Sequence, residues 1–224
     1  VHSTLVTGIW SWSLYGNGSD LVRLTQNPAG LDDWGPTWSP DDEYIAFGRE
    51  VGVDQWRVNR MKKDGTLLTA LSPSGSWHMY PDWSADGTTI AFTDYKENKI
   101  GLMTAVNGTN LGHIPTASYM PSSPCWSPDG RAIIYTGYGP IGIDINKTGI
   151  ESNEISLMAS NLWGSGSATW APDGKNIAYV SQFAEGSGII SVNHNDTTKK
   201  YYIVRGDPPV GTDIEWLPDN TKLA

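Results

Sequence analysis

A five-residue phrase that begins with tryptophan occurs five times in this chain. It stands as WSPDD at 38–42, WSADG at 83–87, WSPDG at 126–130, WAPDG at 170–174 and WLPDN at 216–220. Successive phrases are 45, 43, 44 and 46 residues apart. A fixed period of about 40 to 50 residues indicates a repeat protein, and this length suits one four-stranded blade of a β-propeller. We therefore expect an all-β chain in which residues 1–224 form a single domain.

Each period contains four short runs with the composition of β-strands. The first run leads into the tryptophan phrase. After the turn comes a second, apolar run such as TIAFT at 89–93, and then a third run such as KIGLMT at 99–104. A fourth run, such as EISLMA at 154–159, leads to the next period. Asp-Gly between apolar runs indicates a tight hairpin, which we expect to be a type I′ turn. No segment shows a helical apolar period, so each blade is predicted to be a meander of four antiparallel strands.

The repeat resembles a known family. The stretches PTWSPDDEYIAF, PDWSADGTTIAF and PCWSPDGRAIIY are similar to the Tol-type, WD-like β-propeller repeat of the TolB family, and the resemblance covers essentially the whole chain. It implies a propeller firmly and a function only loosely, because propellers host binding, scaffolding and catalysis alike.

The repeated residues themselves have a structural explanation. A large indole at a fixed phase is expected to pack between blades, and a carboxylate beside a glycine is expected to shape a turn. The tryptophans are Trp38, Trp83, Trp126, Trp170 and Trp216, and the aspartates are Asp41, Asp86, Asp129, Asp173 and Asp219. The single cysteine, Cys125, precedes one of these tryptophans and is expected to be a small buried apolar residue.

The two ends of the chain complete one period between them. GIWSWSLY and DLVRLT, within residues 8–25, match the third and fourth strands of a blade, and 213–224 matches the first strand and the start of the second. Joining the last residue to the first restores a period of 46 residues. We therefore expect five blades, the last shared between the termini, so that no inner edge is unpaired. The alternative is an excerpt of a six-bladed propeller.

Composition narrows the class of partner. The formal net charge of −9 argues against nucleic acid or an anionic membrane surface as the main partner. No apolar run approaches the length needed to span a bilayer, so membrane insertion is not expected. The four histidines are not spaced as metal ligands, and no nucleophile motif is present. We expect no cofactor, no metal site and no catalysis.

The stretches that precede each repeated tryptophan carry residues that the repeat does not require. In a propeller these connections line one mouth of the central tunnel, where aromatic side chains and carboxylates form binding sites. The candidate ligand-binding residues are Asp32, Asp33, Trp34, Trp77, His78, Tyr80, Tyr119, Trp163 and Asp213. The alternative is that the aromatic side chains fill gaps between blades. If the mouth is a binding face, Trp34, Trp77 and Trp163 should be partly exposed.

Four Asn-x-Ser/Thr sequons occur, at Asn17, Asn107, Asn146 and Asn195. All four are expected in the turn between the third and fourth strands of a blade. Two interpretations remain: good turn chemistry, or glycosylation of a secreted protein.

Two functions fit these features. The first is a non-enzymatic binding module outside the cytoplasm, periplasmic or extracellular, that holds a protein, peptide or glycan at one loop face. The second is a structural subunit of an extracellular surface layer or fibre, self-assembled by pairing of terminal strands between subunits.

Overall fold

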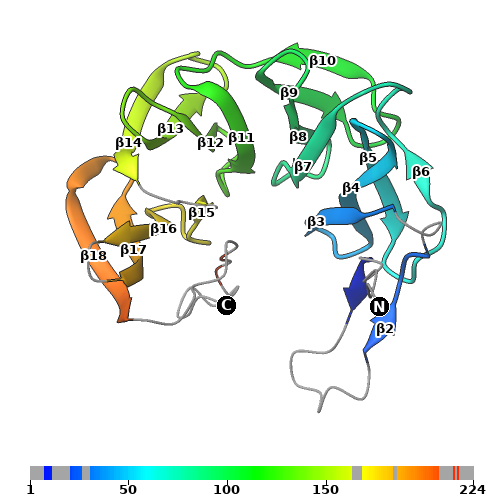
Figure 1. Ribbon diagram of the computed structural model, residues 1–224, viewed down its shortest axis with the longest axis horizontal. Coiled ribbons are helices and arrows are strands. Elements are labelled where there is room, and N and C mark those ends of the chain that lie inside the picture. The colour runs from blue at the N-terminus through cyan, green and yellow to red at the C-terminus, as the bar shows by residue number, and fades with distance from the viewer. Residues whose placement is uncertain are drawn as a thin grey trace.

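The computed structural model is built from antiparallel β-sheets and describes residues 8–11, 21–26, 31–162, 168–183, 186–206, 214 and 216. Among these residues, four sheets have four strands each and a fifth has two. The sheets lie side by side around a common centre, and the first strand of each four-stranded sheet faces that centre (Figure 1). This is the all-β architecture, consistent with a five-bladed propeller, that the repeat predicts.

We number the blades in chain order. Blade 1 contains β3 (Asp33–Trp38), β4 (Tyr44–Gly52), β5 (Gln55–Lys62) and β6 (Thr69–Ala70). Blade 2 contains β7 (His78–Trp83), β8 (Thr89–Asp94), β9 (Lys99–Thr104) and β10 (Asn110–His113). Blade 3 contains β11 (Tyr119–Trp126), β12 (Ala132–Tyr138), β13 (Ile143–Gly149) and β14 (Ile155–Leu162). Blade 4 contains β15 (Ala168–Trp170), β16 (Asn176–Phe183), β17 (Gly186–Asn193) and β18 (Asp196–Gly206). The fifth sheet contains β1 (Trp10–Ser11) and β2 (Val22–Arg23).

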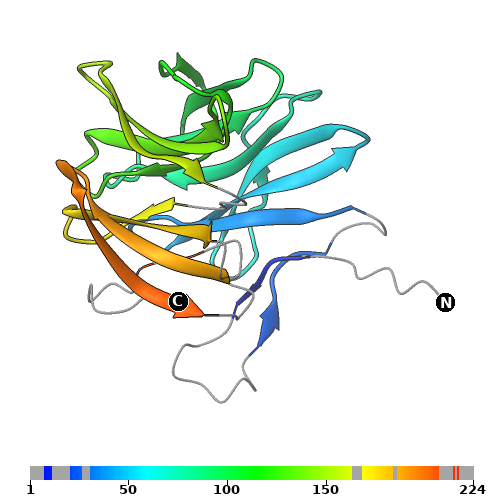
Figure 2. The same ribbon diagram turned by 60° about the vertical axis from the view of Figure 1, so that its left-hand side comes forward.

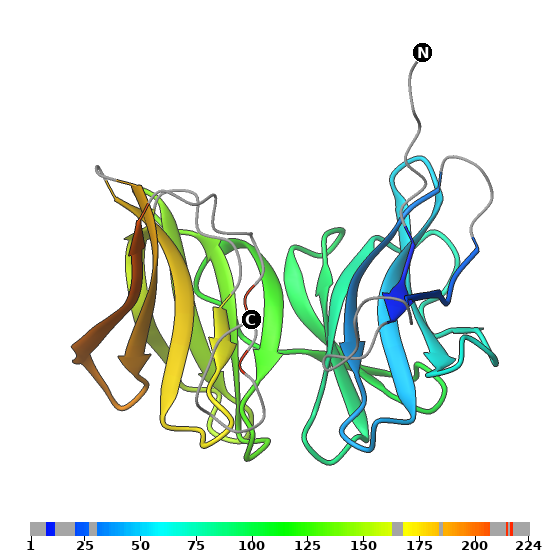
Figure 3. The same ribbon diagram turned by 90° about the horizontal axis from the view of Figure 1, so that it is seen from below.

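The strands of blades 1 to 4 pair in chain order, and the first strand of each ends on the repeated tryptophan. They run between two opposite faces of the molecule, where the connecting turns gather (Figure 3). We call the face that holds the repeated Asp-Gly turns the turn face. The opposite face, where the first strands begin, is the mouth.

The apolar core is divided among the spaces between neighbouring sheets. Trp83 clusters with Ala46 and Val58 of blade 1. Trp126 clusters with residues of blade 2, and Trp170 with residues of blade 3. These three tryptophans are buried, so the prediction that they pack between blades is confirmed. Cys125 packs against the cluster between blades 3 and 4, as expected of a small apolar residue, but it is partly buried where we expected full burial.

Trp38 departs from this prediction, because 49% of its surface is exposed. Its repeat position places it on the face of blade 1 that carries Ile45 and Phe47. That face packs against the fifth sheet through Ile9 and Leu24. The described strands of the fifth sheet, β1 and β2, correspond to the outer strands of a blade, and their cluster does not include Trp38 on the inner strand.

The two ends of the chain contact different blades. β1 pairs with β2 in antiparallel register, with Trp10 opposite Arg23, as the sequence predicts. This sheet lies beside blade 1 (Figure 2), whereas Ile214 and Trp216 pack against Val180 of blade 4. Both contacts fit a fifth blade between blades 4 and 1. The predicted pairing of 213–224 with 8–25 lies largely outside the described residues.

The repeated turn differs from the type I′ turn that we expected. Gly87 has a φ of +71°, but Asp86 is not in the left-handed region, and the Gly87 N–H donates to the Ser84 carbonyl at 2.8 Å. Ser84 Oγ donates to Asp86 Oδ1 at 2.6 Å and accepts the Thr89 N–H at 3.0 Å. The sequence Ser-x-Asp-Gly therefore builds a longer hairpin loop in which glycine supplies a single positive φ. Ser39 and Ser127 make the same bonds, whereas blade 4 has Ala171 at this position.

One carboxylate connects the inner strands of three blades. Asp82, on β7, accepts the Trp126 N–H of β11 at Oδ2, with a distance of 2.7 Å. Its Oδ1 accepts the Thr37 hydroxyl of β3 at 3.3 Å. Blades 1, 2 and 3 are thus linked directly beside the central axis.

Candidate functional site: the mouth of the propeller

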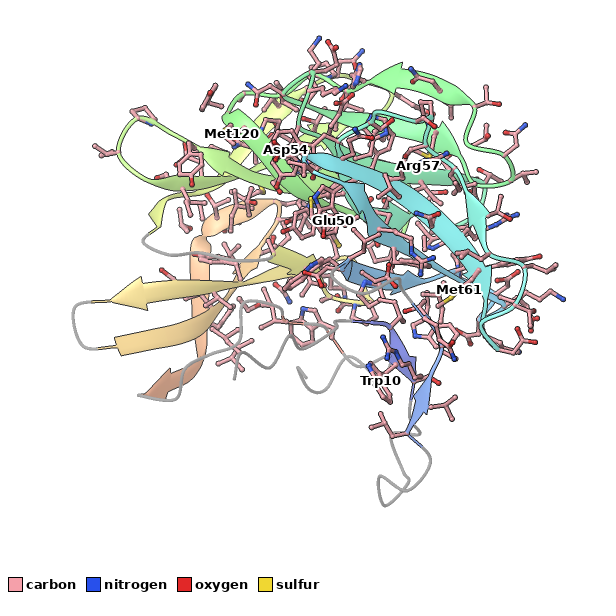
Figure 4. All side chains as sticks on the ribbon, turned by 45° about the vertical axis from the view of Figure 1, so that its right-hand side comes forward. Trp10, Glu50, Asp54, Arg57, Met61 and Met120 are labelled. Carbon is pink, nitrogen blue, oxygen red and sulfur yellow. The ribbon has the colours of Figure 1, made fainter. Side chains whose placement is uncertain are left out.

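The mouth displays apolar side chains from two blades. On β3, Trp34 is 48% exposed, and on β11, Tyr119 is 65% exposed. Further exposed apolar residues lie on the same face: Val51 and Val53 near the β4–β5 turn, Met120 on β11, Tyr138 at the end of β12 and Ile141 in the β12–β13 turn. Figure 4 marks Glu50 on β4, Asp54 in the following turn and Met120. Contiguous exposed apolar surface is a feature of many interaction sites, so these residues are candidates for such a site.

Asp33 does not act as a free carboxylate at this mouth. It is buried, and its two oxygens accept Arg49 Nε at 2.7 Å and Nη2 at 2.9 Å. The two residues face each other across β3 and β4, so the pair fastens the mouth ends of these strands. The adjacent Asp32 is partly exposed, and its N–H donates to Glu50 Oε2 at 3.3 Å. The sequence analysis grouped these two neighbouring aspartates as candidate ligand-binding residues, but in the structure Asp33 is buried in an ion pair and Asp32 is partly exposed.

Inner strands bulge where they approach the mouth. Gly35, Tyr80 and Ser123 each stand three residues before a repeated tryptophan, and each has a positive φ, of 57°, 49° and 52°. The strand register shifts at the same places. A left-handed conformation is unusual for an aromatic residue and is retained where the surrounding structure requires it. A Cβ added at Gly35 would lie 3.3 Å from the Tyr80 ring, so the glycine leaves room for this side chain.

His78 belongs to a hydrogen-bonded chain that crosses blade 2. Its Nδ1 lies 3.0 Å from Ser72 Oγ, and its Nε2 lies 3.5 Å from Asp94 Oδ2. The same carboxylate oxygen lies 3.0 Å from His113 Nε2. Burial raises the pKa of Asp94, but hydrogen bonds from the two histidines and the backbone outweigh burial and lower the pKa well below its usual range.

This hydrogen-bonded group of side chains contains Ser, His and Asp, but it is not arranged for nucleophilic catalysis. Ser72 is buried, and its hydroxyl accepts the Val58 N–H at 3.0 Å. A nucleophile must be open to substrate. The His78 ring also packs on Phe92, with centroids 4.4 Å apart. The chain of bonds therefore fixes the connection between blades 1 and 2. Among the described residues, no cluster of His, Cys, Asp and Glu is suited to hold a metal ion.

The remaining predicted site residues fall into two groups. Trp77 is partly exposed, as expected, and its ring lies 5.4 Å from that of Tyr95. Trp163 and Asp213 lie outside the described residues. The sequence analysis missed the apolar residues near the β4–β5 and β12–β13 turns. Valine and isoleucine in short turns, where polar residues are usual, could have identified them.

The sequons differ in their surroundings. Asn107 and Asn195 lie in exposed turns, and Asn107 Oδ1 accepts the Thr109 N–H and hydroxyl. Asp64 holds Thr66 in the same way, so turn chemistry accounts for the Asn107 pattern without a glycan. Asn146 was expected in a turn but lies within β13, because the pairing of β12 with β13 extends beyond it. Only 3% of its surface is exposed. A glycan cannot be accommodated on that buried side chain. Asn17 lies outside the described residues.

Comparisons with known proteins agree with this architecture. The chain is 24% identical over 184 residues to an uncharacterized protein of Agrobacterium fabrum strain C58, covering 76% of this chain and 61% of that protein. It thus spans less than two thirds of that relative's length. The part of the chain that the structure describes has no helix long and apolar enough to cross a membrane.

Three solved structures share the fold. A putative TolB from Agrobacterium tumefaciens superimposes with a TM-score of 0.70 at 21% identity, covering 83% of this chain and 66% of that one. A chain of a nidogen/laminin complex gives a TM-score of 0.70 at 13% identity, covering 84% of this chain and 70% of that one. An oligogalacturonate lyase in complex with manganese gives a TM-score of 0.66 at 18% identity, covering 91% of this chain and 64% of that one. The sequence model of the TolB β-propeller domain matches residues 12–140, more than half of the chain, and the chain therefore belongs to the TolB β-propeller family.

Proposed function

We propose that this protein is a non-enzymatic binding module that acts outside the cytoplasm and recognises a protein partner through its mouth. The observation that carries the proposal is the group of exposed apolar side chains on that face, led by Trp34 and Tyr119. Large aromatic side chains on a rigid support are the usual anchors of protein interfaces. The TolB family, whose propellers generally serve as protein-binding modules, agrees with this role.

The chemistry of the mouth also describes the partner. Glu50 and Asp54 add acidic groups to the blade 1 side, where Arg49 is paired with Asp33 and Arg57, opposite it, donates to the Ser72 carbonyl. The protein as a whole carries a formal charge of −9. We therefore infer a partner segment that combines apolar side chains with basic residues, because opposite potentials speed association and favour the correct partner.

Site-specific photo-cross-linking tests this function. A benzoylphenylalanine at Tyr119 should cross-link to a defined partner in the periplasmic or secreted fraction of the source organism. The matched control is the same group at Val106, which is 72% exposed and lies in the β9–β10 turn on the opposite face. Trp34→Ser should then weaken binding to that partner at least tenfold, and Val106→Ser should leave it unchanged. Equal cross-linking from both positions, or recovery of the protein only from the cytoplasm, would contradict the proposal.

The same variants distinguish the other ligands that the sequence allowed. If a glycan array or a peptide library binds the mouth, Trp34→Ser should abolish that binding while no protein cross-link forms at Tyr119. That result would retain the face and replace the partner class.

Self-assembly is the second candidate, and the exposure of Trp38 favours it. The other repeated tryptophans in blades 2 to 4 are buried between sheets, whereas Trp38 keeps a large apolar surface open beside the fifth sheet. A second copy could cover this surface by supplying a strand. Light scattering over a hundredfold range of concentration tests this. A concentration-dependent oligomer that Trp38→Ser dissociates would support assembly, and a monomer throughout would exclude it.

A further inference from the structure

The inner strand of blade 3 carries a bulge that the repeat does not require. In blades 1 and 2 the pairing of the first two strands shifts register once, shortly before the repeated tryptophan. In blade 3 it shifts twice, between Tyr119 and Ser122 and again between Ser122 and Cys125. The second of these shifts has the same place in the repeat as the single shift of blades 1 and 2. The first shift is therefore an addition of blade 3.

Met120 lies within this additional bulge. It has no register partner on β12, and its φ is +48°. The residues at the same distance before the tryptophan in blades 1 and 2, Asp32 and Trp77, do not have a positive φ. A left-handed conformation is unfavourable for methionine, and the following Pro121 favours an extended backbone instead. Bulges and strained residues concentrate at functional sites, where they redirect a side chain.

The bulge gives Met120 an exposure that the other methionines of the chain lack. The sequence contains five methionines, and all of them lie in strands that the structure describes. Met120 is 38% exposed at the mouth, whereas the others are buried or, for Met79 on β7, partly buried. The fully buried ones are Met61, Met103 and Met158. Figure 4 labels the buried Met61 and the exposed Met120.

An exposed thioether is open to attack by peroxides. The methionine Sδ takes one oxygen atom from hydrogen peroxide: an S–O bond forms, the O–O bond breaks, and the other oxygen leaves with both hydrogens as water. The sulfur loses two electrons, and the peroxide gains them. The product, methionine sulfoxide, is polar where methionine is apolar, and sulfoxide reductases reverse the change.

Oxidation at this position would place a sulfoxide within the apolar surface of the mouth. Tyr119 precedes Met120 and is 65% exposed, and its register partner Tyr138 is 56% exposed. A sulfoxide oxygen binds water strongly, and an apolar partner that covered it would have to remove that water without replacing the hydrogen bond. A thioether, by contrast, adapts its shape to an apolar partner. The oxidised surface is thus a poorer match for such a partner.

We propose that Met120 is an oxidation site of the mouth, and that its conversion to the sulfoxide by a peroxide weakens binding at this face. The effect on binding rests on the function proposed above. The selectivity of oxidation for Met120 rests only on the bulge and on the burial of the other methionines.

Peptide mapping by mass spectrometry tests the selectivity on the full chain. In folded protein treated with hydrogen peroxide, Met120 should be converted at least about tenfold faster than the three buried methionines, and also faster than Met79. In urea the five rates should become similar, because burial causes the difference. Equal rates in the folded protein, or fastest conversion at Met79, would overturn the proposal.

Retention on a phenyl matrix measures the apolar surface without any biological partner. Oxidised protein should elute earlier than untreated protein, and treatment with a sulfoxide reductase and dithiothreitol should restore its retention. The matched control is Met120→Leu, which keeps an apolar side chain that peroxide cannot oxidise, so its retention should not change. Met79→Leu should shift as the unmodified protein does. A shift of equal size in oxidised Met120→Leu would contradict the proposal, and thermal melts would show that oxidation has not unfolded the chain.

Binding to the protein partner identified by cross-linking at Tyr119 completes the test. Oxidation should weaken this binding at least about fivefold, and oxidised Met120→Leu should bind as before. If Trp34→Ser weakens binding but oxidation does not, this inference is wrong and the proposed function stands. If neither changes binding, the proposed function is wrong and the effect of oxidation on binding falls with it. The peptide map then still decides whether Met120 is the oxidation site.

Discussion

Replacing Asp33 with alanine removes one half of the ion pair that ties β3 to β4 at the mouth. Asp33 has no exposed side-chain surface, and 14% of the Arg49 side chain is exposed, so the guanidinium would be left largely buried without a counter-charge. Breaking a buried pair in this way costs about 3–5 kcal/mol of unfolding free energy. For a chain of 224 residues, that loss corresponds to a decrease in melting temperature of about 6 to 20 °C.

Urea denaturation and calorimetry would measure this effect. The double variant Asp33→Leu with Arg49→Met replaces both charges with apolar groups and should lie within about 2 kcal/mol of the unmodified protein, because a buried pair is often replaceable as a unit. If Asp33→Ala loses less than about 1 kcal/mol, the pair behaves like a surface ion pair and our reasoning fails. If partner binding then also falls, Asp33 is a ligand-binding residue, as the sequence alone suggested.

Three further predictions test other parts of the molecule. Ser84→Ala should lower the unfolding free energy by about 1 kcal/mol by removing two turn hydrogen bonds, and Ala171→Ser, which installs them in blade 4, should raise it by up to about 1 kcal/mol in the same urea assay. Gly101→Ala should destabilise blade 2 by about 1–3 kcal/mol, because its new Cβ would collide with the buried Phe92 ring; an unchanged urea midpoint would refute this contact. Because the pKa of Asp94 is lowered on folding, its contribution to stability is present above about pH 4 and is lost as the pH falls, so Asp94→Asn should flatten the dependence of stability on pH between about 5 and 3.

The sequence predicted the fold well because the same repeat unit occurs five times along the chain. The phase of the repeated tryptophan located the end of each inner strand in blades 1 to 4, and periodicity alone gave four strands per blade. The turn type was wrong because the phrase Asp-Gly does not reveal that the preceding serine joins the hairpin loop through its side chain. The prediction for Trp38 was wrong because a repeat predicts equal surroundings, whereas the apolar cluster between blade 1 and the fifth sheet does not include this residue, which stays exposed.

The candidate site was predicted less completely. Position along the chain placed Trp34 and Tyr119 at the mouth, where both are exposed. It could not show that Asp33 is paired with Arg49, because that pair depends on the strand register.

The bonds made by Asp82 have a consequence for the partner binding that we propose at the mouth. One carboxylate holds the inner strands of three blades, so these blades cannot tilt independently without breaking charge-assisted hydrogen bonds. These bonds lie at the opposite end of the inner strands from the proposed binding surface, and by limiting the relative motion of the blades they would reduce the conformational entropy lost when a partner docks. For a surface of this kind, substitutions at the mouth should change the lifetime of the complex far more than the rate at which it forms.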